Sequence, residues 1–330
     1  MPGLFVGAIV VGSLAGSSAP SVGEYLGGWV DTTVLVLVGL LFFEVRFSEL
    51  RRIRSAPKFL AVALVLNFVV IPLIGWGIAS AAFGAREPAL FVGLLIYFVS
   101  PCTDWFLGFT RMAQGNVGLG SMLLPLNMIV QLLLYPVYLR LIAGGQSGVD
   151  LGATAEVVGQ WFIIPFATSM LVRYLARTLL PRDWFAWLLR VVGAAIPAVI
   201  ALLIVQLFAA NIATVLGHAS SFAVILAAAI VFFAITYGVG EAAARFARLA
   251  YPEKALLVMT TAARNAPLML ALTTVALPGQ PLVYAAIIVG MLIEFPHLIV
   301  LRSVLLRHRP IVHVVTGDER RILRTSPIDS

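Results

Sequence analysis

Apolar runs of about 20 residues follow one another along almost the whole chain, separated by short polar or basic stretches. A run of this length is what an α-helix needs to cross the hydrocarbon core of a bilayer. We predict that each run is one membrane-spanning helix, which gives ten spans. Their predicted bounds are 3–19, 30–46, 57–83, 88–113, 117–142, 154–179, 186–211, 218–245, 254–277 and 282–305.

The composition supports this interpretation. Hydrophobic residues make up 61% of the 330 residues and charged residues 11%, against about half and a quarter in soluble domains. The net charge of +7 would suggest nucleic acid in a soluble protein, but here the basic residues lie at span ends, so no nucleic-acid partner is expected. One cysteine excludes an intrachain disulfide framework and a cysteine-cluster metal site. We expect an all-α polytopic membrane protein in a lipid bilayer, without cofactor or metal.

The basic residues also predict the orientation. If the N-terminus is cytoplasmic, the inner loops hold Arg and Lys at 46–58, 111, 173–182 and 245–254, whereas the outer loops hold little beyond Arg86 and Arg140. This bias predicts that both termini face the cytoplasm of an inner (plasma) membrane, with residues 307–330 as a polar tail. The first run lacks the basic start of a signal peptide, so it is expected to remain as a span.

Ten spans divide into halves of five, and an odd number per half requires that the second half be inverted. We therefore predict a first repeat over 1–143 and a second over 144–306. Pro101 in the fourth span and Pro267 in the ninth lie at nearly the same depth. A proline frees a helix carbonyl, which in a membrane must be buried in protein or line water. The sequence thus predicts broken, crossing fourth and ninth helices around a small polar cavity.

Polar residues gather at these breaks and in the spans that follow each of them. Charged side chains at mid-span cost roughly 2.5–3.5 kcal/mol on an insertion scale, so they are expected to serve a purpose. Asp104 and Arg264 are predicted to meet, either as an ion pair that braces the crossing or as contacts for substrate or protons. The candidate transport residues are Cys102, Asp104, Asn127, Gln131, Arg264 and Asn265.

Glu294 and His297 are candidates for proton coupling. Glu294 has no obvious partner in the first half, where Gln131 occupies the comparable place. Apolar surroundings favour the neutral form of an unpaired carboxyl group, which suits reversible protonation. His297 lies one helical turn later and either assists proton movement or simply faces the protein interior. Glu-x-x-His also occurs in di-metal bundles, but those need a second copy and more carboxylates, so no metal site is expected.

Cys102 allows several interpretations. Buried cysteines are commonly small, inert core residues. A nucleophilic thiol needs a nearby base, and of the four histidines only His297 lies inside a span, so an intramembrane enzyme using Cys102 and Asp104 is disfavoured. A soft sulfur suits soft, thiophilic ligands, and a single one permits the release that transport requires.

Several motifs resemble those of the Acr3-type arsenite efflux permeases, a branch of the bile acid/arsenite/riboflavin transporter superfamily. LNMIVQLLLYPVYL is similar to the fifth-span signature, VGMLIEFPHLIVL to the tenth-span motif, and FFEVRFSELRR to the basic loop after the second span. Cys102 matches the family's fourth-span cysteine by position. The resemblance implies a panel of spans 1, 2, 6 and 7 against a core of spans 3–5 and 8–10. It also implies export of arsenite in exchange for protons, with functional roles for Cys102 and Glu294.

The fourth-span SPCTDWFLGFTR and the ninth-span ARNAPLMLA depart from the family pattern. A cationic Arg264 at the crossing would repel sodium unless Asp104 neutralises it, so we expect proton coupling rather than sodium coupling. These departures leave other substrates open: antimonite, an organoarsenical, or a small organic anion held by Arg264, carried with sodium or protons. A non-transporting sensor is not expected, because the polar tail shows no signalling domain.

Overall fold

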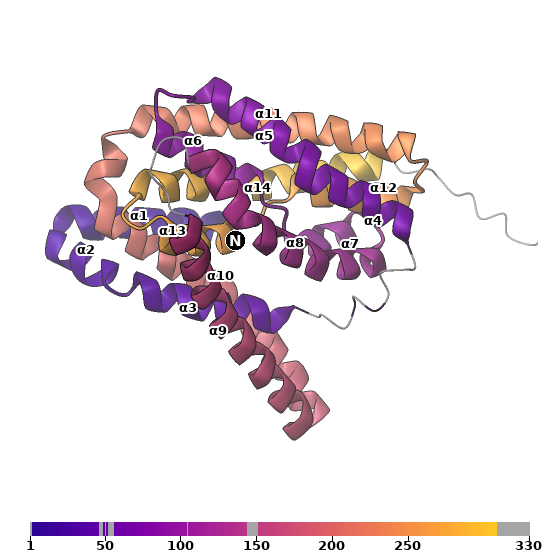
Figure 1. Cartoon of the computed structure of the whole chain (residues 1–330), viewed down its shortest axis with the longest axis horizontal. Helices are drawn as coiled ribbons and strands as arrows, with labels where there is room; N and C mark the ends of the chain where they lie inside the picture. The colour runs from indigo at the N-terminus through magenta and orange to yellow at the C-terminus, as the bar shows by residue number, and fades with distance from the viewer. Residues whose placement is uncertain are drawn as a thin grey trace, which may run out of the picture.

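The computed structural model describes residues 2–45, 49, 51, 56–103, 105–143 and 151–308, and these residues form helices and their connections (Figure 1). The first half contains α1 Pro2–Ser18, α2 Pro20–Gly27, α3 Val30–Glu44, α4 Pro57–Val65, the π-helical segment η2 Leu66–Val70, α5 Ile71–Ala82, α6 Pro88–Phe98, α7 Phe106–Met112 and α8 Val117–Ala143. The second half contains α9 Leu151–Leu179, α10 Arg182–Leu216, α11 Ala219–Phe246, α12 Tyr251–Ala262, α13 Ala266–Ala276 and α14 Pro281–Arg307. The predicted tail lies outside the described residues from position 309 onward.

Five stretches of described helix are long and apolar enough to cross a membrane, and α2 with α3, bent by 45°, would make a sixth. The five are Pro57–Ala82, Val117–Leu141, Arg182–Leu216, Ser220–Phe246 and Pro281–Arg307. The chain is therefore a polytopic, helical membrane protein. The helices α1, α6 and α13 are apolar but shorter, so the count of ten spans stays a prediction.

The helices pack in a pattern that brings distant parts of the chain together. The long helix α10 contacts α1, α2 and α3, and α3 also contacts α9. Elsewhere α6 packs against α14 and α5, and α11 packs against α12, α14 and α5; α5 and α11 run side by side along the top of Figure 1. Large apolar side chains remain exposed on the outer helices, as expected where lipid replaces water.

Small residues allow α1 to lie directly against the backbone of α10. A Cβ atom added at Gly16 would lie 2.1 Å from the carbonyl oxygen of Ala209, and one at Gly12 would lie 2.6 Å from that of Val205. Close approach of this kind is typical of membrane helix pairs, which associate through packing rather than through the hydrophobic effect.

We therefore expect Gly16→Ala to destabilise the protein, because the new methyl group must push α1 away from α10. Overpacking of this kind costs about 1–3 kcal/mol. Thermal unfolding of the purified protein in detergent measures the effect. Gly7→Ala is the matched control, since nothing lies within 4 Å of its added Cβ. Equal unfolding temperatures for the two variants would show that the helices adjust without cost.

Both predicted breaks occur where the prolines suggested. The first separates α6, which ends at Phe98, from α7, which begins at Phe106 and follows Pro101. The second separates α12, which ends at Ala262, from α13, in which Pro267 is the second residue. Pro267 thus lies in the first turn of a helix, where its missing N–H costs nothing.

Candidate functional site

The two breaks cross and pair with each other. Pro101 and Arg264 face one another as an isolated antiparallel bridge. On either side of them the backbone N–H of Cys102 donates to the carbonyl of Ala263 at 3.0 Å, and the N–H of Asn265 donates to the carbonyl of Ser100 at 2.9 Å. Pro101 and Arg264 form a non-hydrogen-bonded pair, in which the two facing residues exchange no backbone hydrogen bonds. The missing N–H of Pro101 therefore leaves no bond unmade. The crossing thus satisfies backbone groups that the breaks set free.

Arg264 is completely buried at this crossing, with 0% exposure. Its guanidinium group donates to three backbone carbonyls: Phe98 at 2.9 Å, Thr260 at 3.1 Å and Thr261 at 2.6 Å. These carbonyls belong to the last turns of α6 and α12, which have no helical partners for them. The ring of Phe232 lies 5.7 Å from the guanidinium carbon, within the range of a cation–π contact. Arg264 therefore ties together the ends of two half-helices.

Asp104, the predicted partner of Arg264, lies outside the described residues, so that pairing stays a prediction. The expectation that Glu294 lacks a partner is wrong. Glu294 is 0% exposed, and its Oε1 accepts from the indole N–H of Trp105 at 2.8 Å and from the backbone N–H of Arg264 at 2.9 Å. Its Oε2 accepts from the hydroxyl of Tyr97 at 3.2 Å. A carboxyl group in α14 therefore bonds to both breaks, because three donors converge on it.

Amide side chains form a second polar layer next to the crossing. The side chain of Asn265 donates to the hydroxyl of Thr103 at 2.8 Å and to Oε1 of Gln131 at 3.5 Å. The amides of Asn67 and Asn127 both donate to the hydroxyl of Thr260, at 3.2 and 3.4 Å. The structure thus brings Asn127, Gln131 and Asn265 to the same region as Arg264 and Glu294.

Cys102 lies in the buried core and His297 packs against an aromatic ring. The Cys102 side chain is 1% exposed and belongs to the buried core. The ring of His297 stacks on Phe233 at 4.2 Å with an interplanar angle of 8°. Its Nε2 has no hydrogen-bond partner among the residues that the structure describes. A direct role of Cys102 in substrate binding and of His297 in proton transfer stays a prediction.

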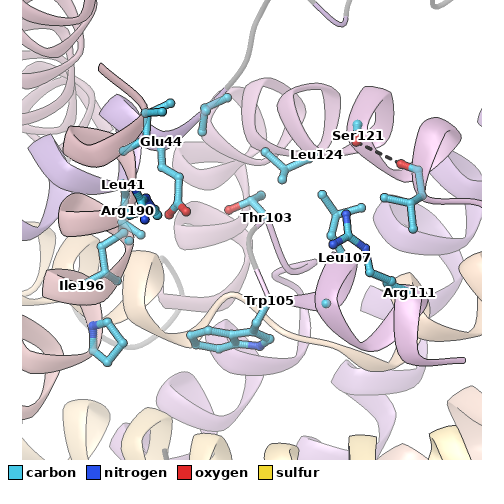
Figure 2. Close-up of a pocket in the computed structure, with 17 residues that line it drawn as sticks. Leu41, Glu44, Thr103, Trp105, Leu107, Arg111, Ser121, Leu124, Arg190 and Ile196 are labelled. Carbon is cyan, nitrogen blue, oxygen red and sulfur yellow. Dashed lines mark hydrogen bonds between the residues drawn. The ribbon is translucent and has the colours of Figure 1, made fainter. Parts of the chain in front are cut away.

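A cavity of about 790 Å³ lies beside the crossing (Figure 2). One wall comes from α3 and α10, and the opposite wall from α7, α8 and the first break. Thr103 and Trp105, the residues that contact Asn265 and Glu294, line it directly. The other labelled lining residues are Leu41, Glu44, Leu107, Arg111, Ser121, Leu124, Arg190 and Ile196. The cavity thus reaches the first break, and Cys102 is not among its lining residues.

Charged side chains lie at two ends of this cavity. In Figure 2, Glu44 and Arg190 lie near each other at one end and Arg111 at the other. Gly193 makes room for the acid, because a Cβ there would lie 3.2 Å from Oε1 of Glu44. Such a cavity, mostly apolar with a few polar and charged groups, is typical of a binding site for a small solute.

Several site residues were missed from the sequence. Tyr97 and Trp105 resemble ordinary apolar residues of their run, and Arg111 was interpreted only as an orientation signal. Arg190 lies near a span end, where basic residues are common. Asn67 had a signal, an amide in the middle of the apolar stretch LVLNFVV. It lies in a π-helical segment, which often marks a functional site.

Comparison with known proteins agrees with this architecture. The chain is 23% identical over 313 residues to the arsenical-resistance protein Acr3 of Corynebacterium glutamicum, covering 90% of this chain and 83% of that protein. It is 20% identical over 275 residues to the uncharacterized sodium-dependent transporter YocS of Bacillus subtilis, covering 81% and 80%. It is 26% identical over 151 residues to the protein YbaS of B. subtilis, covering 45% of this chain and 49% of that protein. The chain spans about half the length of YbaS and of two further curated relatives.

A family model matches residues 32–218, which is more than half of the chain and includes α3, both halves of the first break and α10. The matched segment therefore contains both walls of the cavity. The chain belongs to the Sodium Bile acid symporter family.

Proposed function

We propose that the protein is a secondary transporter that moves a small solute through the cavity beside the crossing. The observation that carries this proposal is that α3 and α10 form one wall and the first break with α7 and α8 the other. Sliding of one wall against the other would open the crossing alternately to each side of the membrane. The proposal includes ten spans in two inverted repeats, residues 1–143 and 144–306. It also includes a panel of spans 1, 2, 6 and 7 that moves against the remaining core.

Arsenite is the solute we propose first, exported from the cytoplasm across the inner membrane, with both termini inside. The support is the similarity to an arsenical-resistance protein over 90% of the chain. Cys102 directly precedes Thr103, which lines the cavity, and a thiol is a suitable soft ligand for As(III). Since Cys102 is buried here, the contact requires another stage of the transport cycle in which the break opens.

Growth of an arsenite-sensitive bacterial host tests this solute. Expression of the protein should restore growth on arsenite, and Cys102→Ser should reduce it to the level of the empty vector. Thr236→Ser, a change in a buried side chain of α11, is the matched control and should protect fully. Immunoblots must show equal amounts of each variant in the membrane. Full protection by Cys102→Ser would remove the thiol from the mechanism.

A small organic anion is the second candidate, because Arg111 and Arg190 line the cavity and can attract a carboxylate. Replacing both arginines by glutamine should reduce anion uptake into liposomes much more than arsenite uptake, since arsenious acid is neutral near pH 7. Equal loss for both solutes would mean that the arginines shape the cavity and do not select the charge.

Exchange for protons is the coupling we propose, with the buried carboxyl group of Glu294 as the proton carrier. The relative YocS is named a sodium-dependent transporter, which makes sodium the alternative. Counterflow in liposomes separates the two: a pH step should drive arsenite uphill, whereas a sodium gradient at constant pH should not. Transport driven by sodium alone would contradict proton coupling.

A further inference from the structure

The crossing contains a cation that the chain itself supplies. The guanidinium group of Arg264 is fully buried and donates to the carbonyls of Phe98, Thr260 and Thr261 at 2.6–3.1 Å. These carbonyls lie at the C-terminal ends of α6 and α12, where the helix dipoles place partial negative charge. The arrangement resembles a coordination shell in which carbonyl oxygens from two elements converge on one positive group.

Unwound carbonyls and half-helix C-terminal ends are also the groups that hold sodium in transporters with broken helices. In this chain three oxygens of this kind already accept hydrogen bonds from Arg264. A sodium ion among them would lie next to a second, immobile positive charge in a site with little solvent. These three carbonyls therefore do not fit sodium while Arg264 is bonded to them.

The surroundings of Arg264 suit a permanent cation. The carboxyl group of Glu294 accepts a hydrogen bond from the backbone N–H of Arg264 and supplies an opposite charge nearby. The face of Phe232 adds a favourable electrostatic contact from the other direction. A buried charge without such compensation would be expelled or neutralised.

We infer that Arg264 is a tethered substitute for the coupling cation, so that the crossing of this family member is assembled without sodium. This inference rests on the proposed transport role and deepens its coupling step. A cation fixed to the chain cannot be released to either side, so its positive charge stays at the crossing throughout the cycle. Solute movement must then draw on another ion or on the solute's own gradient.

A thermal-unfolding experiment on the purified full chain in detergent tests the inference without any assay of solute. Unfolding temperatures are compared in sodium chloride and in choline chloride at equal ionic strength. The wild type should unfold at the same temperature in both salts. In Arg264→Gln the carbonyls lose their cation, and sodium should raise the unfolding temperature by roughly 2–4 °C. Arg264→Lys keeps a tethered charge and should stay insensitive.

A higher unfolding temperature of the wild type in sodium chloride than in choline chloride would overturn the inference. So would a folded Arg264→Gln variant with the same unfolding temperature in both salts. Arg264→Ser is a second variant with more space for the ion. If neither neutral variant folds in choline chloride but one folds in sodium chloride, the inference is supported. If neither variant folds in either salt, equal unfolding temperatures of the wild type in the two salts support the inference and a higher one in sodium overturns it. A wrong solute would leave all of these unfolding temperatures unchanged, so failure of the proposed function is distinguishable.

Discussion

Glu294→Gln is expected to abolish transport and to lower the unfolding temperature strongly. In the native protein both carboxyl oxygens accept hydrogen bonds, from Trp105, Tyr97 and the backbone of Arg264. Glutamine replaces one acceptor oxygen by an NH₂ group, so that this group faces another donor. Leaving a buried polar group without its hydrogen bond costs about 1–3 kcal/mol. The substitution also removes a carboxyl group that can carry an opposite charge near the buried guanidinium group of Arg264.

Thermal unfolding and liposome counterflow on the same preparations measure both effects. The matched control is Glu24→Gln, at an exposed position of α2, which should leave both quantities unchanged. An unfolding temperature equal to that of the wild type would mean that Glu294 does not hold the crossing together. Retained pH-driven transport would remove Glu294 from the coupling mechanism.

Gly193→Phe is expected to reduce transport at least tenfold while leaving the unfolding temperature within a few degrees of the wild type. Gly193 lies on α10 in the wall of the cavity, and its added Cβ would meet only the flexible carboxylate of Glu44, at 3.2 Å. The ring therefore enters the cavity without displacing a helix, and it hinders any solute there. A loss of transport of about tenfold corresponds to about 1.4 kcal/mol.

Gly7→Phe is the control for this change, because nothing lies within 4 Å of a Cβ added at Gly7. Counterflow should be measured with arsenite and with an organic anion, so that the result does not depend on the choice of solute. Transport at the wild-type rate by Gly193→Phe would mean that the cavity between α3, α7, α8 and α10 is not the path of the solute.

The sequence predicted the breaks because the membrane restricts the backbone so strongly. A proline in an apolar run, with polar residues beside it, has few acceptable explanations in a bilayer. Pro101 and Pro267 therefore located both interruptions, and Arg264 and Asn265 were correctly associated with the second. The helix α2 was not predicted. It begins after Ala19, whose φ of −147° interrupts the helical backbone within a stretch of small residues.

The partners of Glu294 were not predictable from the pattern. Tyr97 and Trp105 are more than 180 residues away in sequence, and their polar atoms become relevant only when the two breaks cross. The direction of Cys102 was equally hidden. Helical spacing assigns a face to each residue, but Cys102 and Thr103 lie in a non-helical segment, where neighbouring side chains point to different surroundings.

Thiol labelling from defined sides of the membrane tests most directly whether the cavity at the crossing is a water-filled transport path. Cys102→Ser removes the only cysteine of the sequence, and Thr103→Cys then places one thiol in the cavity wall, with Leu95→Cys in the buried face of α6 as control. In sealed vesicles of each orientation, a membrane-impermeant maleimide should label position 103 and not position 95. Labelling of neither position from either side, or equal labelling of both, would contradict the account.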